Sequence, residues 1–260
     1  MQAKLTTSEF SYLLHALQAQ NVIGVNNAQL FPDEGKGRDA LLSDGLQSLK
    51  DHGWLQPSGE GAFKTHTGLV LLAAVIASPE QTIMLTKAMP DNGRQTITYY
   101  FAQGMVVEQF YTTDEQYLLT QMDTVTNAIS RLQQALGIPD KSQTWETTIT
   151  LNTDTFEQAM KQAKDGDLSG LFATMREIGI DSNSDRLELL AKLIGGVQPV
   201  GKLEIATLSE ERLNSLQELM ILHAEDKSVW GMSSDNGAKS VYLQPLDGTR
   251  FTSILDSFLK

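Results

Sequence analysis

The chain has 260 residues, no cysteine, and 32 acidic against 20 basic side chains, which gives a formal net charge of −12. The absence of cysteine excludes a disulfide framework, a thiol nucleophile and a zinc–thiolate site. The negative charge argues against binding to nucleic acid or to an anionic membrane, because both would repel the chain. No secretory signal is visible at the N-terminus, and the longest apolar stretch, Gly68 to Ala77, is about half the length that spans a bilayer. We therefore expect a cytoplasmic protein.

Helical periodicity dominates the first part of the chain. From Leu5 to Gln20, apolar residues recur at i, i+3, i+4 and i+7 behind a possible N-cap at Ser8, which predicts a first helix. Asn21 to Gly37 contains Gly, Asn and Pro and predicts a loop. Three further elements are predicted next, namely a helix from Asp39 to His52 that Gly53 ends, a small hairpin from Trp54 to Lys64, and a buried helix from Thr65 to Ala77 that Pro79 stops.

After the third predicted helix the sequence favours β-strands, because Val, Ile, Tyr and Phe become frequent. A turn signal at Pro90 to Gly93 separates the first two predicted strands. Beyond Thr113, which is a suitable N-cap, we predict a helix that runs to about Leu136. The three predicted strands are Thr82 to Ala88, Thr96 to Gln103 and Met105 to Thr112.

The second part of the chain is predicted to repeat this order of helices followed by strands. Short turns join the strands, and turns of this length do not permit the crossovers that parallel strands need. The predicted elements are helices at Thr153 to Ala163, at Gly170 to Ile178 and from a Ser184 cap to Ile194, strands at Lys202 to Leu208, Leu216 to Ala224, Ser228 to Ser233 and Ser240 to Leu246, and a final helix at Thr249 to Leu259.

We interpret the chain as two halves of similar plan. The segment Leu72 to Thr86 aligns with Ile194 to Leu208, and the order of strands and helices after each segment is the same. A chance recurrence of this order is the alternative. The predicted fold is α+β, with an N-terminal half at 1–140 and a C-terminal half at 141–260, each a helical cluster packed on an antiparallel sheet.

The chain lacks the residue spacings that identify common catalytic and metal sites. Neither HExxH nor GxSxG occurs. Asp181 to Asp185 resembles the start of a calcium-binding loop, but Arg186 and Lys192 replace the glycine and the glutamate that such a loop needs. We expect no metal, no cofactor and no enzymatic activity. No pair of histidines has a helical metal spacing; these residues are His15, His52, His66 and His223.

Residues 39–76 show the helix, turn, wing-like segment and helix of a winged-helix module. This order makes a transcriptional regulator the alternative function. A DNA-binding module needs a basic recognition helix. Residues 34–66 instead hold four basic and five acidic side chains. The order therefore predicts helical geometry without a role on DNA.

The segment Glu225 to Ser240 is an insertion that the first half lacks. In an extended strand, Trp230 and Met232 would project to the same face. Aromatic residues and methionine are enriched at the cores of protein interfaces. We predict a protein-binding role for this pair. The alternative is that both side chains cap the hydrophobic core under a long hairpin.

Several segments together carry a family resemblance. They are the run Leu49-Lys50-Asp51-His52-Gly53-Trp54-Leu55, the Gly68 to Ala77 helix with Pro79 behind it, the strand Ile83 to Thr86, and the closing strand Val241 to Leu246 with helix Thr249 to Leu259. This arrangement resembles the EspG family, the cytosolic chaperones of type VII secretion. The resemblance implies two related α+β halves and a non-enzymatic protein that recognises the helical tip of secreted PE–PPE-type partners. The family has no short signature, so no binding residue is carried over.

Overall fold

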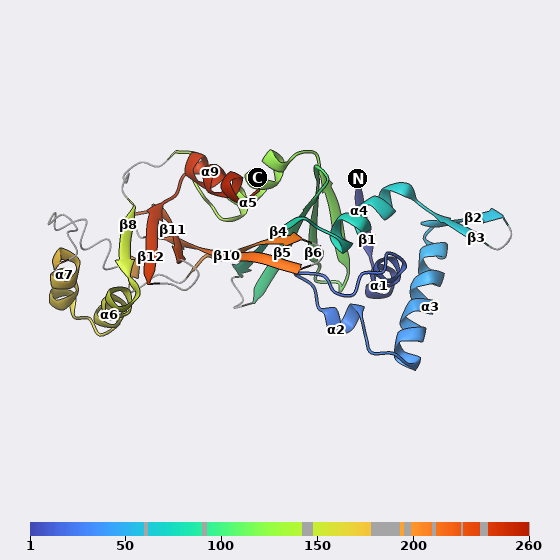
Figure 1. Cartoon of the computed structure of the whole chain (residues 1–260), viewed down its shortest axis with the longest axis horizontal. Helices are drawn as coiled ribbons and strands as arrows, with labels where there is room; N and C mark the ends of the chain where they lie inside the picture. Colours follow the sequence, from blue (N-terminus) through green and yellow to red (C-terminus); the bar gives the residue numbers. More distant parts are fainter. Residues whose placement is uncertain are drawn as a thin grey trace. The chain divides into compact units, whose positions relative to one another are not determined.

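We analysed a computed structural model of the chain (Figure 1). Its contacts divide the chain into two compact units, which are described separately below. The first unit contains Met1–Leu85, Gln95–Ala128 and Ile205–Leu216, and the second contains Thr86–Arg94, Ile129–Glu204 and Gln217–Lys260. The structure describes residues 1–59, 62–89, 93–141, 148–177, 193–194, 199–209, 212–224, 226–234 and 239–259.

The first unit begins with a strand that the sequence did not predict. Gln2–Leu5 forms β1, and the first helix starts only at Thr7. The N-cap is Thr6, not Ser8: its hydroxyl accepts the Glu9 amide N–H, and the Glu9 carboxylate accepts the Thr6 amide N–H at 2.8 Å. This capping box explains why the helix begins where it does. The helices of the unit are α1 (Thr7–Ala16), α2 (Asn27–Leu30), α3 (Lys36–Asp51) and α4 (Thr67–Ala77).

The predicted helix from Thr113 to about Leu136 is wrong in its first part. Tyr117–Met122 forms strand β7, and helix α5 covers only Val125–Ala135. Strand β7 pairs with β1 on one side and β6 on the other, so its backbone groups are satisfied by distant segments. The strands of this unit lie in the order β1-β7-β6-β5-β4, where β4 is Gln81–Ala88, β5 is Arg94–Ala102 and β6 is Met105–Tyr111.

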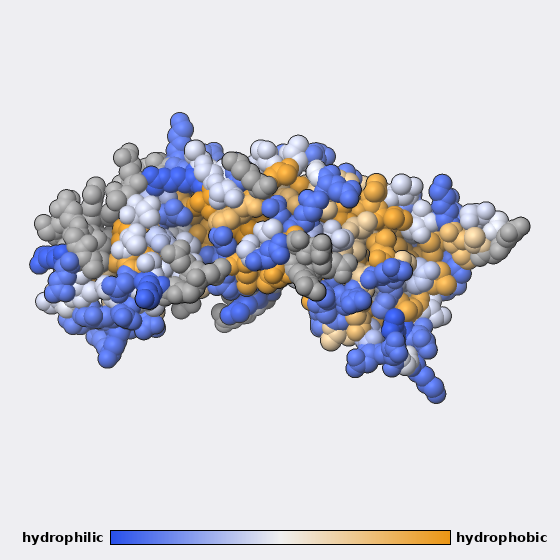
Figure 2. All heavy atoms as spheres, in the orientation of Figure 1, coloured by the Kyte–Doolittle hydropathy of each residue, from blue (hydrophilic) through white to orange (hydrophobic). Residues whose placement is uncertain are grey.

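The core of the first unit lies between these strands and the helices. Helix α4 packs on β6 and β7, and α1 packs on α3 and α4. Each large side chain that is fully buried stabilises the unit by about 1.5–3 kcal/mol. Such side chains include Phe10, Leu14, Leu72, Tyr100 and Leu119. Helix α3 buries little besides Gly45 and Leu49, and the surface over it is mostly hydrophilic in Figure 2.

A separate two-stranded sheet confirms the predicted small hairpin. It consists of β2 (Leu55–Gly59) and β3 (Ala62–Thr65), which pair antiparallel between α3 and α4 in the chain. Phe63 on this hairpin is 43% exposed, and the Lys50 ammonium lies 4.1 Å from the centre of its ring. The ammonium therefore covers the face of an aromatic ring that would otherwise be open to water.

The strands of the second unit lie in the order β9-β10-β11-β12-β8, and the parts of β9 and β10 within Ile205–Leu216 belong to the first unit. Strand β8, which the sequence analysis did not predict, pairs antiparallel with β12. Of the predicted helix from the Ser184 cap to Ile194, only Leu193 and Ile194 lie within the described residues, and both are helical. The turn at Asp235 to Gly237 lies outside the described residues. The elements are β8 (Ile149–Asn152), β9 (Gly201–Ser209), β10 (Arg212–His223), β11 (Val229–Ser234), β12 (Ser240–Pro245), α6 (Thr153–Lys164), α7 (Leu168–Glu177) and α9 (Gly248–Phe258).

The core of the second unit lies where α6 and α7 meet the sheet. Helix α6 contacts β8, β12 and α7. The cluster brings Ala159 and Met175 of the helices against Leu151, Trp230 and Leu243 of the strands.

Mixed helices and antiparallel strands confirm the α+β class. The division into similar halves at residue 140 stays a prediction. Among the described residues, none of the helices combines the length and the hydropathy that a bilayer crossing requires.

Candidate functional site

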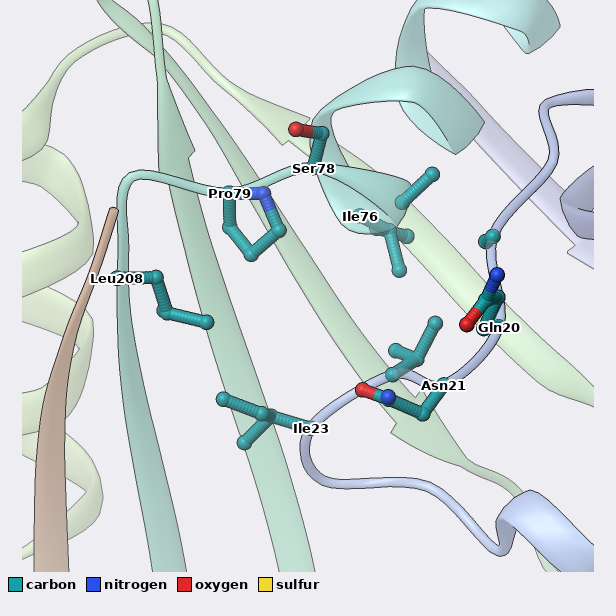
Figure 3. A pocket seen from close by; sticks show the side chains of 10 residues that line it. Gln20, Asn21, Ile23, Ile76, Ser78, Pro79 and Leu208 are labelled. Atoms are coloured by element: carbon teal, nitrogen blue, oxygen red, sulfur yellow. The ribbon is translucent and has the colours of Figure 1, made fainter. Parts of the chain in front are cut away.

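A pocket of about 250 Å³ opens in the first unit, where three segments from distant parts of the chain meet (Figure 3). The segments are the loop after α1, the C-terminal end of α4, and strand β9. The apolar side of the pocket, which we call the floor, consists of Ile23, Ile76, Pro79 and Leu208, and the side chains of Gln20, Asn21 and Ser78 add polar groups. The lining residues are Ala19, Gln20, Asn21, Val22, Ile23, Ile76, Ala77, Ser78, Pro79 and Leu208.

The loop after α1 is held in place by hydrogen bonds to its backbone. The Asn27 side chain accepts the Val22 N–H at 2.8 Å and donates to the Val22 carbonyl at 2.9 Å. The Tyr100 hydroxyl donates to the Ile23 carbonyl at 2.5 Å. Burial raises the pKa of Tyr100, which keeps this hydroxyl a donor across the physiological range. These bonds position one wall of the pocket.

Gly24 allows this loop to lie against the sheet. Its φ is +80°, and a Cβ built on it would lie 2.1 Å from the Thr98 hydroxyl oxygen. Gly24→Ala is therefore expected to lower the free energy of unfolding by roughly 2–4 kcal/mol, from backbone strain and steric overlap together. Urea unfolding followed by circular dichroism measures the change.

Gly37→Ala is the matched control, because a Cβ at Gly37 meets nothing within 4 Å and its position lies in helix α3. This change should stabilise the chain by about 0.5–1 kcal/mol through helix propensity. Equal effects of the two changes would contradict the close approach of Gly24 to Thr98.

The opposite wall is the end of α4. The Ser78 N–H donates to the Ala74 carbonyl and closes the last turn at 3.1 Å. Pro79 has no N–H for the Val75 carbonyl. The Glu80 N–H donates to the Phe101 carbonyl at 2.9 Å instead of to the Ile76 carbonyl. The helix therefore ends with acceptors that have no amide donor within the helix.

The hairpin of β9 and β10 adds exposed apolar surface beside Leu208. Only two residues separate Ser209 from Arg212, so Leu208 and Leu213 stand at the same end of the hairpin. Leu213 is 56% exposed and Leu216 is 37% exposed. Among the described residues, the pairing of β11 with β10 runs from Leu219 to His223. We call Leu208, Leu213 and Leu216 the hairpin-end surface.

The structure gives Trp230 and Met232 different environments. Both lie on β11, and the Trp230 side chain is fully buried in the core of the second unit, with its indole N–H donating to the Ser228 hydroxyl at 2.9 Å. Met232 is half-buried against the same core. Trp230 is therefore a core residue of the second unit. The protein-binding role of Trp230 and Met232 stays a prediction.

Glu9 is the centre of a buried polar cluster, and both of its carboxylate oxygens are occupied by hydrogen bonds within the chain. One carboxylate oxygen accepts the Ser48 hydroxyl at 2.8 Å and contacts His52 Nδ1 at 2.6 Å, and the other accepts the Thr6 N–H. Its side chain is 1% exposed. The contacts to Ser48 and His52 join α1 to the C-terminal end of α3, so the cluster stabilises the helix pair.

The other histidines are dispersed. His223 Nε2 lies 2.8 Å from the Leu136 carbonyl, and the His66 ring packs edge-on against Trp54. The His15 ring packs against Phe31, and partial burial, with a smaller effect of Arg38, lowers its pKa. Within the described ranges, His, Asp and Glu side chains nowhere gather in threes that could hold a metal ion.

Comparisons with known proteins identify the fold but no sequence relative. No protein-family model matches the chain, and no curated protein is similar to it in sequence. The fold is similar to a solved structure of the type VII secretion system chaperone EspG5 of Mycobacterium tuberculosis in complex with a PE25–PPE41 dimer, at 9% sequence identity. The match covers 100% of this chain and 96% of that chain, with a TM-score of 0.64. The chain therefore has an EspG-like fold over its whole length.

Proposed function

We propose that this chain is a non-enzymatic cytoplasmic module that binds another protein, as a secretion chaperone binds its client. The fold match to EspG5 carries the proposal, because it extends over both units and nearly all of the other chain. In that solved structure, EspG5 is in complex with a PE25–PPE41 dimer. By analogy, the expected client here is a helical secreted protein.

The hairpin-end surface is the place where we expect the client to bind. Its exposed leucines lie next to a pocket, and exposed apolar groups beside a polar rim are typical of protein interaction sites. Hydrophobic residues also gather over α4 in Figure 2, and Leu71 of that helix is 47% exposed. Burial of these side chains against a client would provide the driving force for association.

The winged-helix alternative is supported only by the order of its elements. Residues 39–76 do contain a helix, a hairpin and a helix, in the order of such a module. A recognition helix must present basic side chains to DNA. The helix before the hairpin, α3, holds three basic and three acidic side chains, and the helix after it, α4, has no basic residue and buries Leu69, Leu72 and Ile76. Neither helix therefore presents a basic surface.

Capture and identification of a client test the proposed function. The purified chain is immobilised, cytosol of the native host is passed over it, and retained proteins are identified by mass spectrometry. The retained protein is then purified and its affinity measured by calorimetry. Leu213→Glu should weaken this affinity at least tenfold, or by about 1.4 kcal/mol, because it places a charge in an apolar contact.

Leu168→Glu is the matched control. Leu168 is 49% exposed at the start of α7, far in sequence from the hairpin-end surface, and its replacement should leave the affinity unchanged. Equal losses of affinity from Leu213→Glu and Leu168→Glu would contradict client binding at the hairpin-end surface. Salt-sensitive binding of a defined DNA fragment, without any protein client, would refute the proposal and favour a regulator.

A further inference from the structure

We propose that the pocket between the loop after α1 and the end of α4 is a socket for one lysine or arginine side chain of the bound protein. The inference rests on the proposed function, because it names the chemical group that the client presents. The volume of the pocket, about 250 Å³, lies below the roughly 300–1,000 Å³ of small-molecule sites. A cavity of this size suits a single side chain.

The negative end of a helix faces this pocket. Helix α4 runs from Thr67 to Ala77 and ends at the lining residues Ile76 and Ala77. The carbonyl groups of Val75 and Ile76 have no amide donor in the helix, since Pro79 lacks an N–H and the Glu80 N–H donates to Phe101. The dipole of the helix favours a positive charge at this end.

The remaining polar groups can turn acceptors toward the same charge. In Figure 3 the amide side chains of Gln20 and Asn21 lie across the pocket from Leu208, with Ser78 at a third side. Amide and hydroxyl oxygens both accept hydrogen bonds, and an ammonium or guanidinium has only donors to offer. The donor-only chemistry of a cation therefore complements this wall.

The floor of the pocket suits the apolar part of the same side chain. Ile23, Ile76, Pro79 and Leu208 line it. Lysine and arginine bury their methylene groups on apolar surface while the charged end reaches polar groups. One long basic side chain would satisfy the floor and the acceptors together, whereas an aliphatic side chain leaves the acceptors unpaired and an acidic one is disfavoured by the helix dipole.

The charges around the pocket also favour a cation. None of the ten lining residues is charged. Glu80 follows Pro79 directly, and its carboxylate accepts the Gln103 N–H at 3.3 Å. Arg38 lines the neighbouring pocket and lies 3.5 Å from Glu34, so that positive charge is compensated. The whole chain carries a charge of −12, which would attract a basic partner.

The test uses four small probes and an isotope-labelled chain. The probes are the N-acetyl N′-methylamides of lysine, arginine, norleucine and glutamate, titrated at millimolar concentration while ¹⁵N–¹H spectra are recorded. The lysine and arginine probes should shift the amide signals of Gln20, Asn21, Ser78 and Leu208 in a saturable manner. Norleucine should bind at least about tenfold more weakly, because it lacks the charge-assisted hydrogen bonds. Glutamate should cause no saturable shift.

Gln20→Lys supplies a blocking variant, because it places a lysine of the chain itself at the rim. It should abolish the response to the lysine and arginine probes. Gln29→Lys is the control, because it adds the same charge at an exposed position of α2 outside the pocket. This control should leave the titration unchanged. Equal binding of norleucine and lysine, or preferred binding of glutamate, would overturn the socket.

The same two variants separate the socket from the proposed function. With a purified client, Gln20→Lys should weaken binding at least tenfold and Gln29→Lys should not. A client that binds Gln20→Lys with full affinity, together with silent probe titrations, would refute the socket and leave the proposed function intact. Saturable lysine binding in the pocket without any client would support the cation site and refute the function proposed for it.

Discussion

Trp230→Ala is expected to lower the free energy of unfolding by about 3–5 kcal/mol, which is the usual cost of removing a large buried aromatic side chain. Trp230 is 0% exposed and lies between Leu222 of β10 and Pro245 of β12 in the strand register. The substitution also removes the indole N–H that donates to the Ser228 hydroxyl. For a chain of this size, the melting temperature should fall by roughly 6–20 °C. Scanning calorimetry and urea unfolding measure both quantities.

Phe63→Ala is the control for the loss of an aromatic ring at the surface. Phe63 is 43% exposed and contacts the Lys50 ammonium, so its removal should cost about 1 kcal/mol or less. A Trp230→Ala chain of unchanged stability that no longer binds a client would contradict the core role and restore Trp230 as a contact residue. Client-binding experiments at this strand should therefore use Met232, which is only half-buried.

Glu9→Ala should destabilise the chain by roughly 2–4 kcal/mol. The bond from the Glu9 N–H to the Thr6 hydroxyl remains, because it uses the backbone of residue 9, so the loss comes from the carboxylate contacts. The Ser48 hydroxyl and the Thr6 amide lose their buried acceptor, at about 1–3 kcal/mol for a group left unsatisfied. Urea unfolding followed by far-ultraviolet circular dichroism gives the change, and the dependence on urea concentration shows whether the unfolded state has altered.

Glu157→Ala is the matched control, because Glu157 is exposed in the middle of helix α6. Its removal should change the stability by less than about 0.5 kcal/mol. The loss of stability caused by Ser48→Ala should lie between the losses caused by Glu157→Ala and Glu9→Ala, since it removes one donor and leaves the capping box intact. If Glu9→Ala were as mild as Glu157→Ala, the contacts that join α1 to α3 would contribute little to folding.

The local sequence was sufficient for most helices and strands. The apolar run of α4 ends at Ala77 because Pro79 cannot continue a helix, and both features are readable without a structure. Gly53 has a positive φ, as its place directly after a predicted helix indicated. The α+β class followed from the same local patterns, since periodicity and turn residues act over a few neighbouring positions.

Three strands escaped the sequence analysis for one physical reason. Strand β7 was predicted as part of a helix, and β1 and β8 were not predicted. Gln2 pairs with Thr120 and Ile149 pairs with Leu243, so the partners that stabilise these strands are remote in the chain. A short segment with ambiguous propensity adopts the structure that its distant partners favour.

The candidate site was also beyond the reach of the sequence. It joins the loop at Gln20 to the helix end at Ile76 and to Leu208, and no spacing rule connects these positions. Trp230 and Met232 lie two residues apart on a strand, so the sequence does determine that they share a face. Whether that face meets a partner or the core depends on what packs against it. Burial results from the packing of side chains that are remote in the chain, and only the tertiary structure decided that Trp230 lies inside.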